Sequence, residues 1–107
     1  MKVKPVIPRA GANRDVEEAV DHYLVADAAD AALGFVDALE RSYAHISRHP
    51  ASGSTRYSDQ LDLPGLRSWN IKDYPYVIFY FECEDRVDVW RVLHGQRDIP
   101  SWLKSAG

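Results

Sequence analysis

The chain has 107 residues, with 13 Lys and Arg against 16 Asp and Glu, and a single Cys. This length holds one domain, expected over residues 1–107, and a composition of 46% apolar and 27% charged residues excludes intrinsic disorder. One Cys excludes an internal disulfide, and no apolar run is long enough for a membrane span or a signal peptide, so we expect a cytoplasmic protein without membrane contact.

Charge is unevenly distributed along the sequence. Residues 10–40 hold eight acids and one base, whereas the rest of the chain is mildly basic. This asymmetry indicates either a solvated helix surface or two faces with different partners. A net charge of −3 argues against broad, nonspecific nucleic-acid binding, which depends on the neutralisation of phosphates.

The first fifty residues predict a short strand and two helices. Residues 2–7 alternate like a strand, but their prolines cannot donate ladder hydrogen bonds, so this strand lies at an edge. Asn13 is the expected N-cap of a first helix over about residues 14–26, because acids fill the turn that follows it. Asp27 is the expected cap of a second helix, which Pro50 ends. Two helices joined by so short a link form an antiparallel hairpin.

The second half predicts a loop and a three-strand meander. Residues 50–65 are rich in Ser, Gly, Pro and Asp and predict a long surface loop. Strands are expected over Leu66–Lys72, Tyr76–Cys83 and Arg86–His94, joined by short turns. The middle strand is apolar on both faces, so the helices cover one face and the C-terminal segment or a second chain covers the other. The predicted fold class is therefore α+β: an antiparallel sheet with an N-terminal strand, a C-terminal meander and a helical hairpin on one face.

Metal binding and nucleophilic catalysis have little support in the sequence. His45 and His49 have the spacing of two ligands on one helix face, but no Glu lies between them as in a zincin motif. His near a helix C-terminus also complements the helix dipole. Cys83 lies between two glutamates, whose charges oppose thiolate formation. We therefore expect neither a metal nor a cofactor.

A group of basic residues is the remaining candidate site. Arg67 lies on the first strand of the meander, Arg91 and His94 lie on the last, and Arg97 follows. If neighbouring strands bring these side chains together, they form a clamp for phosphate or carboxylate, with His94 as an acid or base. The alternative is that Arg67 and Arg91 pair with acids and only stabilise the sheet. The acids available for such pairing are Asp62, Asp88 and Asp98.

These residues resemble a known family, the ParE branch of the RelE/ParE superfamily of toxin–antitoxin toxins, also called plasmid stabilisation proteins. The resemblance is carried by residues 64–67, by the strand 76–80 and above all by the run from Arg91 to Asp98. It implies inhibition of DNA gyrase, at its A subunit, by protein contact rather than catalysis, and neutralisation by a ParD-like antitoxin. It implies nucleic-acid binding only through the antitoxin complex at its operator.

The resemblance and the sheet pattern together give the candidate site residues. The target-binding candidates are Arg91, His94, Arg97 and Trp102. The two-sided apolar strand predicts an apolar face covered by the antitoxin, with contact candidates Tyr76, Ile78, Tyr80 and Trp90. One alternative is a RelE-like ribosome-dependent ribonuclease using Arg67, His94 and Arg97, although no Lys pair precedes Arg67 and Trp102 stands where that branch has a Tyr. Another is a degenerate toxin that only binds the antitoxin.

Overall fold

The computed structural model describes residues 3–96 and Ile99. The elements, in chain order, are β1 (Val6–Pro8), α1 (Ala10–Val25), α2 (Ala29–Arg48), the short 3₁₀ helix η1 (Pro50–Ser52), α3 (Arg56–Leu61), β2 (Leu66–Asn70), β3 (Tyr76–Glu82) and β4 (Val87–His94). Among the described residues, no helix is long and apolar enough to cross a membrane.

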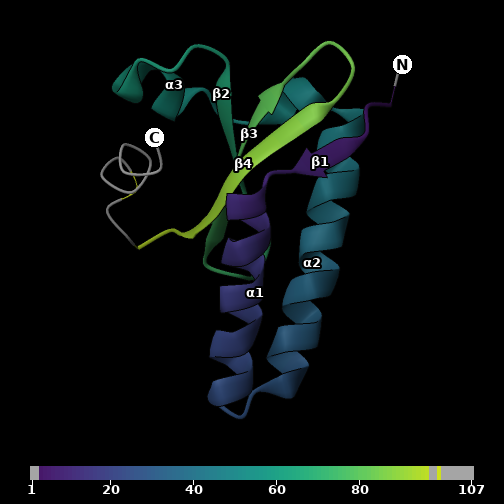
Figure 1. Ribbon diagram of the computed structural model, residues 1–107, viewed down its shortest axis with the longest axis vertical. Helices are drawn as coiled ribbons and strands as arrows, with labels where there is room; N and C mark the ends of the chain where they lie inside the picture. The colour runs from purple at the N-terminus through teal and green to yellow at the C-terminus, as the bar shows by residue number, and fades with distance from the viewer. Residues whose placement is uncertain (1–2, 97–98, 100–107) are drawn as a thin grey trace.

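The four strands form one sheet in the order β1-β4-β3-β2, with the α1–α2 hairpin against one face (Figure 1). The antiparallel meander β2-β3-β4 is confirmed. The sheet is mixed rather than wholly antiparallel, because β1 pairs parallel with β4, with Val6 opposite Val87. Parallel neighbours need a long crossover connection, and the helical hairpin is part of it.

Both helices begin differently from the sequence prediction. α1 starts at Ala10 with Arg9 as its N-cap residue, so Asn13 lies inside the helix and its backbone N–H donates to the Arg9 carbonyl at 3.0 Å. The cause is tertiary, because the Arg9 N–H is itself bonded to the Val89 carbonyl at 2.9 Å and the chain passes directly from β1 into α1. Asp27 has φ of +57° in the inter-helix turn, and Ala28 is the N-cap residue of α2.

The segment 50–65 is not simply a loop, because it contains η1 and α3. The Tyr80 hydroxyl holds its first part, donating to the Pro50 carbonyl at 2.8 Å and accepting from the Gly53 N–H at 3.0 Å. A Cβ at Gly53 would overlap this hydroxyl, so the close approach requires glycine. Ser54, between η1 and α3, forms an antiparallel bridge with Ser68 of β2 and so attaches this segment to the sheet.

Two apolar clusters cover the two faces of the sheet. The larger lies under the hairpin and includes Phe35, Ile46, Ile78 and Tyr80. The smaller lies on the opposite face and is built from four buried residues, Leu66, Phe79, Leu93 and Ile99. Side chains of α3, Tyr57 and Leu61, pack against it. The expectation that both faces are covered is confirmed, and part of the cover comes from a helix in the segment expected to be a loop.

Tyr43 of α2 offers a test of the larger core. Its hydroxyl is buried without a hydrogen-bond partner among the described residues, and burial, with a smaller effect of Asp15, raises its pKa to about 12 from the usual 10.0. Tyr43→Phe removes this unpaired polar group and is expected to raise the free energy of unfolding by about 1 kcal/mol at pH 8. Urea titration measures this gain, and a loss of similar size would contradict it.

The raised pKa also fixes the sign of the pH dependence. Between about pH 10 and 12 the unfolded chain ionises Tyr43 while the folded chain keeps the proton, so wild-type stability falls as pH rises through this window. The Phe variant lacks this loss. We therefore expect its advantage over the wild type to be larger at pH 11 than at pH 8.

Candidate functional site

Arg91 is held by a buried acid on the first helix. Because β1 ends at Pro8, the second half of β4 has α1 beside its edge instead of a strand. Asp15 of α1 accepts hydrogen bonds from Arg91 Nε at 2.7 Å, from Arg91 Nη2 at 2.8 Å and from the Val92 N–H at 3.0 Å. One carboxylate therefore binds the guanidinium in a bidentate manner and satisfies a strand-edge donor as well.

The burial of this pair defines its role. The side chains of Arg91 and Asp15 are 17% and 7% exposed. The hydrogen bonds that Arg91 donates to Asp15 raise the pKa of Arg91 despite the opposing effect of burial. The guanidinium therefore stays charged and is paired with Asp15. The pair fixes α1 to the end of β4, so Arg91 is not a free clamp for phosphate or carboxylate.

His94 lies at the end of the same strand, beside a cavity. Its Nδ1 accepts the Gln96 N–H at 3.1 Å, and its ring meets that of Tyr76 edge-on, with centroids 5.2 Å apart. The cavity, of about 270 Å³, lies between α1 and β4 and is also lined by Glu18 and His22. His94 is thus partly accessible, and the cavity beside it is also lined by the carboxylate of Glu18 and the imidazole of His22.

Arg67 has a structural role on β2. Its Nη1 donates to the carbonyl oxygens of Ala51 and Gly53, at 3.0 and 2.8 Å, and so fixes the segment after α2 against the sheet. The alternative that Arg67 pairs with an acid finds no such pair among the described residues. Arg67 instead donates to main-chain acceptors that only the folded segment brings close.

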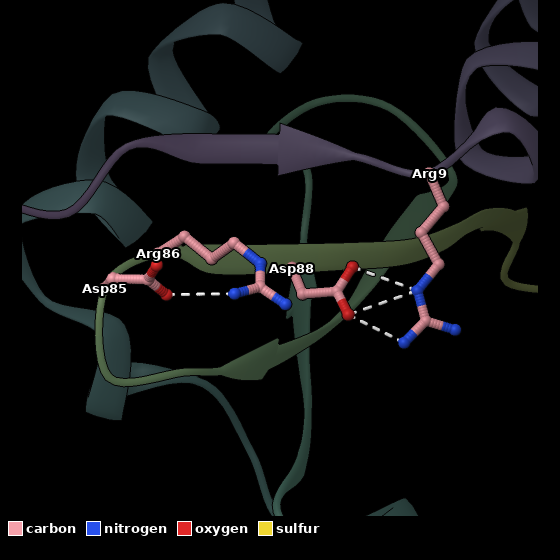
Figure 2. Close-up of polar contacts among 4 residues, drawn as sticks. All are labelled: Arg9, Asp85, Arg86 and Asp88. Carbon is pink, nitrogen blue, oxygen red and sulfur yellow. Dashed lines mark hydrogen bonds and ion pairs between the residues drawn. The ribbon is translucent and has the colours of Figure 1, made fainter.

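Asp88, one of the three acids that the ion-pair alternative offered to Arg67 and Arg91, is bound elsewhere. Asp88 pairs with Arg9, which donates from Nε at 3.0 and 3.1 Å and from Nη2 at 2.6 Å (Figure 2). Asp85 and Arg86 form a separate contact of 2.9 Å at the start of β4. Asp98 lies outside the described residues. The sheet is thus stabilised by ion pairs, as one alternative expected, but with different partners.

Arg67 and His94, two of the three residues of the alternative nuclease site, lie apart in the described structure. Arg67 is opposite Tyr80 on β3, whereas His94 is opposite Tyr76. Four residues of extended strand separate these positions, roughly 13 Å at the usual rise per residue. Arg97 and Trp102 lie outside the described residues. Arg67 and His94 therefore belong to different ends of the sheet.

Three of the four antitoxin-contact candidates are core residues. Ile78 and Tyr80 are fully buried and Tyr76 is 8% exposed, all in the cluster under the hairpin. This corrects the expectation that they form an open apolar face, because the helices cover the side of β3 on which they lie. Trp90 packs on the opposite face, partly buried, with its ring 5.9 Å from that of Phe81.

The histidines of α2 serve packing. Within the described part of the chain, no three His, Cys, Asp or Glu side chains gather as metal ligands. His45 and His49 have their rings 5.1 Å apart, and His45 stacks on Trp69 of β2 at 4.4 Å. The i, i+4 spacing of the two histidines therefore reflects contact along the helix and with the sheet.

The comparisons with known proteins agree with this architecture. Residues 6–99 match the family described as the ParE toxin of the type II toxin–antitoxin system, parDE. The chain belongs to the ParE toxin family. A solved structure titled "Chromosomal ParDE TA system from P. aeruginosa" has the same fold, with a TM-score of 0.71 and 16% identity over 88% of this chain and 98% of that one. A search of curated proteins found no match.

Family membership confirms the predicted resemblance and the α+β class. In this chain β1 is followed by the α1–α2 hairpin and, after η1 and α3, by the three strands of the meander. The protein is thus a ParE-type toxin, the toxin component of a toxin–antitoxin system, and ParE toxins are generally not catalytic enzymes. The Asp15–Arg91 pair was not predicted, because acids early in a helix are equally typical of dipole compensation.

Proposed function

We propose that this ParE toxin inhibits DNA gyrase, through its A subunit, by direct protein contact in the cytoplasm, and that a ParD-like antitoxin neutralises it. The observation that carries the proposal is the family match over residues 6–99. The geometry of β4 supports it, because Asp15 binds Arg91 and so fixes the end of β4, where His94 lies, to α1. Arg and Trp dominate the energy of protein interfaces, so Arg97 and Trp102 remain the target-binding candidates.

Inhibition by protein contact also fits the hydrogen bonding of Arg67 and Arg91 better than ribonuclease catalysis does. A ribonuclease of the RelE type would need Arg67 free to stabilise a phosphate, yet its Nη1 is hydrogen-bonded to two carbonyl oxygens. Arg91 is likewise neutralised by Asp15. Both arginines thus already make contacts that hold the fold, Arg67 through Nη1 and Arg91 through its pair with Asp15.

The direct test incubates the purified toxin with gyrase and supercoiled plasmid, and in parallel with translating ribosomes. Accumulation of cleaved plasmid, reversed by the antitoxin, is the expected result. Cleavage of mRNA on the ribosome would instead support the ribonuclease alternative. Antitoxin binding without either activity would identify a degenerate toxin.

Substitutions distinguish the same alternatives in cells. Arg97→Ala combined with Trp102→Ala is expected to relieve growth inhibition while antitoxin binding persists, whereas His94→Gln alone has little effect because no proton is transferred. A nuclease using His94 would instead lose about 10²–10⁴-fold in activity. Growth assays with circular dichroism as a folding control measure both. Full toxicity of the double variant contradicts the assignment of Arg97 and Trp102.

A further inference from the structure

The cavity between α1 and β4 has a buried, largely apolar floor. Three buried side chains, one each from α1, β4 and the neighbouring strand β3, form this floor: Ala19, Val92 and Tyr76. The volume of about 270 Å³ is below the roughly 300–1,000 Å³ of most small-molecule sites, so the cavity suits one side chain of a partner protein better than a cofactor. A floor of this kind packs on the methylene groups of a long side chain.

The polar lining of the cavity has one carboxylate without a partner. Asp15 and Glu18 both line it, and within the described part of the chain no Lys or Arg does. Asp15 is paired with Arg91, whereas Glu18 forms no hydrogen bond or ion pair among the described residues. His94 accepts the Gln96 N–H at Nδ1, so its ring is neutral in this arrangement. Glu18 therefore gives the cavity an uncompensated negative charge.

Glu18 is close to the end of β4. It lies one helical turn after Asp15, so the two carboxylates share one face of α1. The pKa of Arg91 is raised by its hydrogen bonds to Asp15, with a smaller contribution from the charge of Glu18. Because Asp15 already holds the Arg91 guanidinium, the carboxylate of Glu18 is free to bind a second cation.

The chemistry of the cavity favours an arginine side chain over other occupants. Glu18, His22 and His94 are of types that bind metals, but no three such groups gather as ligands within residues 3–96 and 99. A second copy of the chain would bring another acidic helix, since α1 carries four acids and one Arg. An arginine side chain has a long apolar stem, and its planar guanidinium binds one carboxylate through two hydrogen bonds.

We propose that the cavity between α1 and β4 receives an arginine side chain of the gyrase A subunit, with Glu18 binding its guanidinium and the buried floor packing on its methylene groups. The inference rests on the gyrase target of the proposed function and names a specificity contact within it. An enzyme that binds DNA presents Lys and Arg to neutralise phosphates, so an acidic cavity suits such a target. His94, a target-binding candidate, lines the same cavity.

Charge reversal at two adjacent glutamates tests the cavity against the general acidity of α1. Glu18→Arg is expected to weaken binding of the purified gyrase A subunit by about 10-fold or more at low salt, and less at high salt. Glu17→Arg makes the same change at an exposed neighbour that does not line the cavity, and is expected to bind within about 2-fold of the wild type. Calorimetry at pH 8 measures both. Equal weakening by the two variants, or wild-type affinity of Glu18→Arg, overturns the proposal.

Two small probes of nearly the same shape test the occupant. N-acetylarginine amide carries a guanidinium, whereas N-acetylcitrulline amide carries a neutral urea group. At millimolar concentration the arginine probe is expected to shift the ring signals of His22 and His94 in the NMR spectrum of the toxin, and the citrulline probe is not. Glu18→Gln keeps the size of the side chain and is expected to lose these shifts. Equal responses to the two probes, whether shifts or none, overturn the assignment of a guanidinium.

The outcomes separate this inference from the proposed function. If gyrase binds the two glutamate variants equally well, the cavity proposal fails and the function stands. If the toxin neither binds nor inhibits gyrase but the arginine probe shifts both histidines, the guanidinium site stands and the target is wrong. If Glu18→Arg weakens antitoxin binding and leaves gyrase binding unchanged, the cavity belongs to the antitoxin and the proposal is overturned.

Discussion

Phe79→Ala is expected to lower the free energy of unfolding by about 3–5 kcal/mol. Phe79 is fully buried at the centre of β3, in the smaller core cluster. Its ring meets that of Tyr57 edge-on, with centroids 5.3 Å apart, so it joins α3 to the sheet. The substitution removes the aromatic ring and leaves a cavity that the sheet backbone cannot close, and urea denaturation measures the loss.

A matched truncation checks that the loss comes from burial. Leu33→Ala removes an apolar side chain that is 71% exposed on α2, and is expected to change stability by less than about 0.5 kcal/mol. A loss below about 1 kcal/mol for Phe79→Ala would show that α3 does not seal this face.

The sheet and hairpin were predictable because their signals are local. Apolar residues at helical and strand spacing located α2 and the meander to within a few residues. Gly34 inside α2 is explained only by the structure, since a Cβ there would overlap the Tyr74 hydroxyl. The aromatic ring of Tyr74 packs against Phe35 at 5.8 Å, which stabilises the helix at its weakest residue.

The errors have a common physical cause, which is contact between residues far apart in sequence. α3 has only six residues, too few to be stable alone, and is held by the packing of Tyr57 on Phe79. The direction of β1 depends on a long crossover, which strand patterns do not encode. A strand that is apolar on both faces also gives no indication of which face the helices cover, so Ile78 and Tyr80 were misplaced on a surface.

The candidate site was predictable only as a list of residue types. The sequence placed Arg91 and His94 on one strand, and the structure confirms that placement. The partner of Arg91 lies 76 residues away on α1, and no spacing rule connects them.

Asp15→Asn is the second substitution with a large expected effect, a loss of about 3 kcal/mol in the free energy of unfolding. The amide is neutral, so the Arg91 cation stays 17% exposed without a counter-charge, and one of the two oxygens that accept its hydrogen bonds is replaced by a donor. The estimate is at the low end of the range for breaking a buried pair because Arg91 retains contact with water. Chemical denaturation at pH 7 measures it.

Asp37→Asn provides the matched control, since it breaks a similar Asp–Arg pair on the surface of α2. Asp37 and Arg41 are 65% and 74% exposed and 2.6 Å apart, and an exposed pair contributes at most about 0.5 kcal/mol. Because Asp15 also joins α1 to the end of β4, its loss should loosen the end of β4 at His94. We therefore expect folded Asp15→Asn to inhibit gyrase less well than Asp37→Asn. Equal stability of the two variants would show that the Asp15–Arg91 pair is no stronger than a surface ion pair, and the proposed fixing of the end of β4 to α1 would then be wrong.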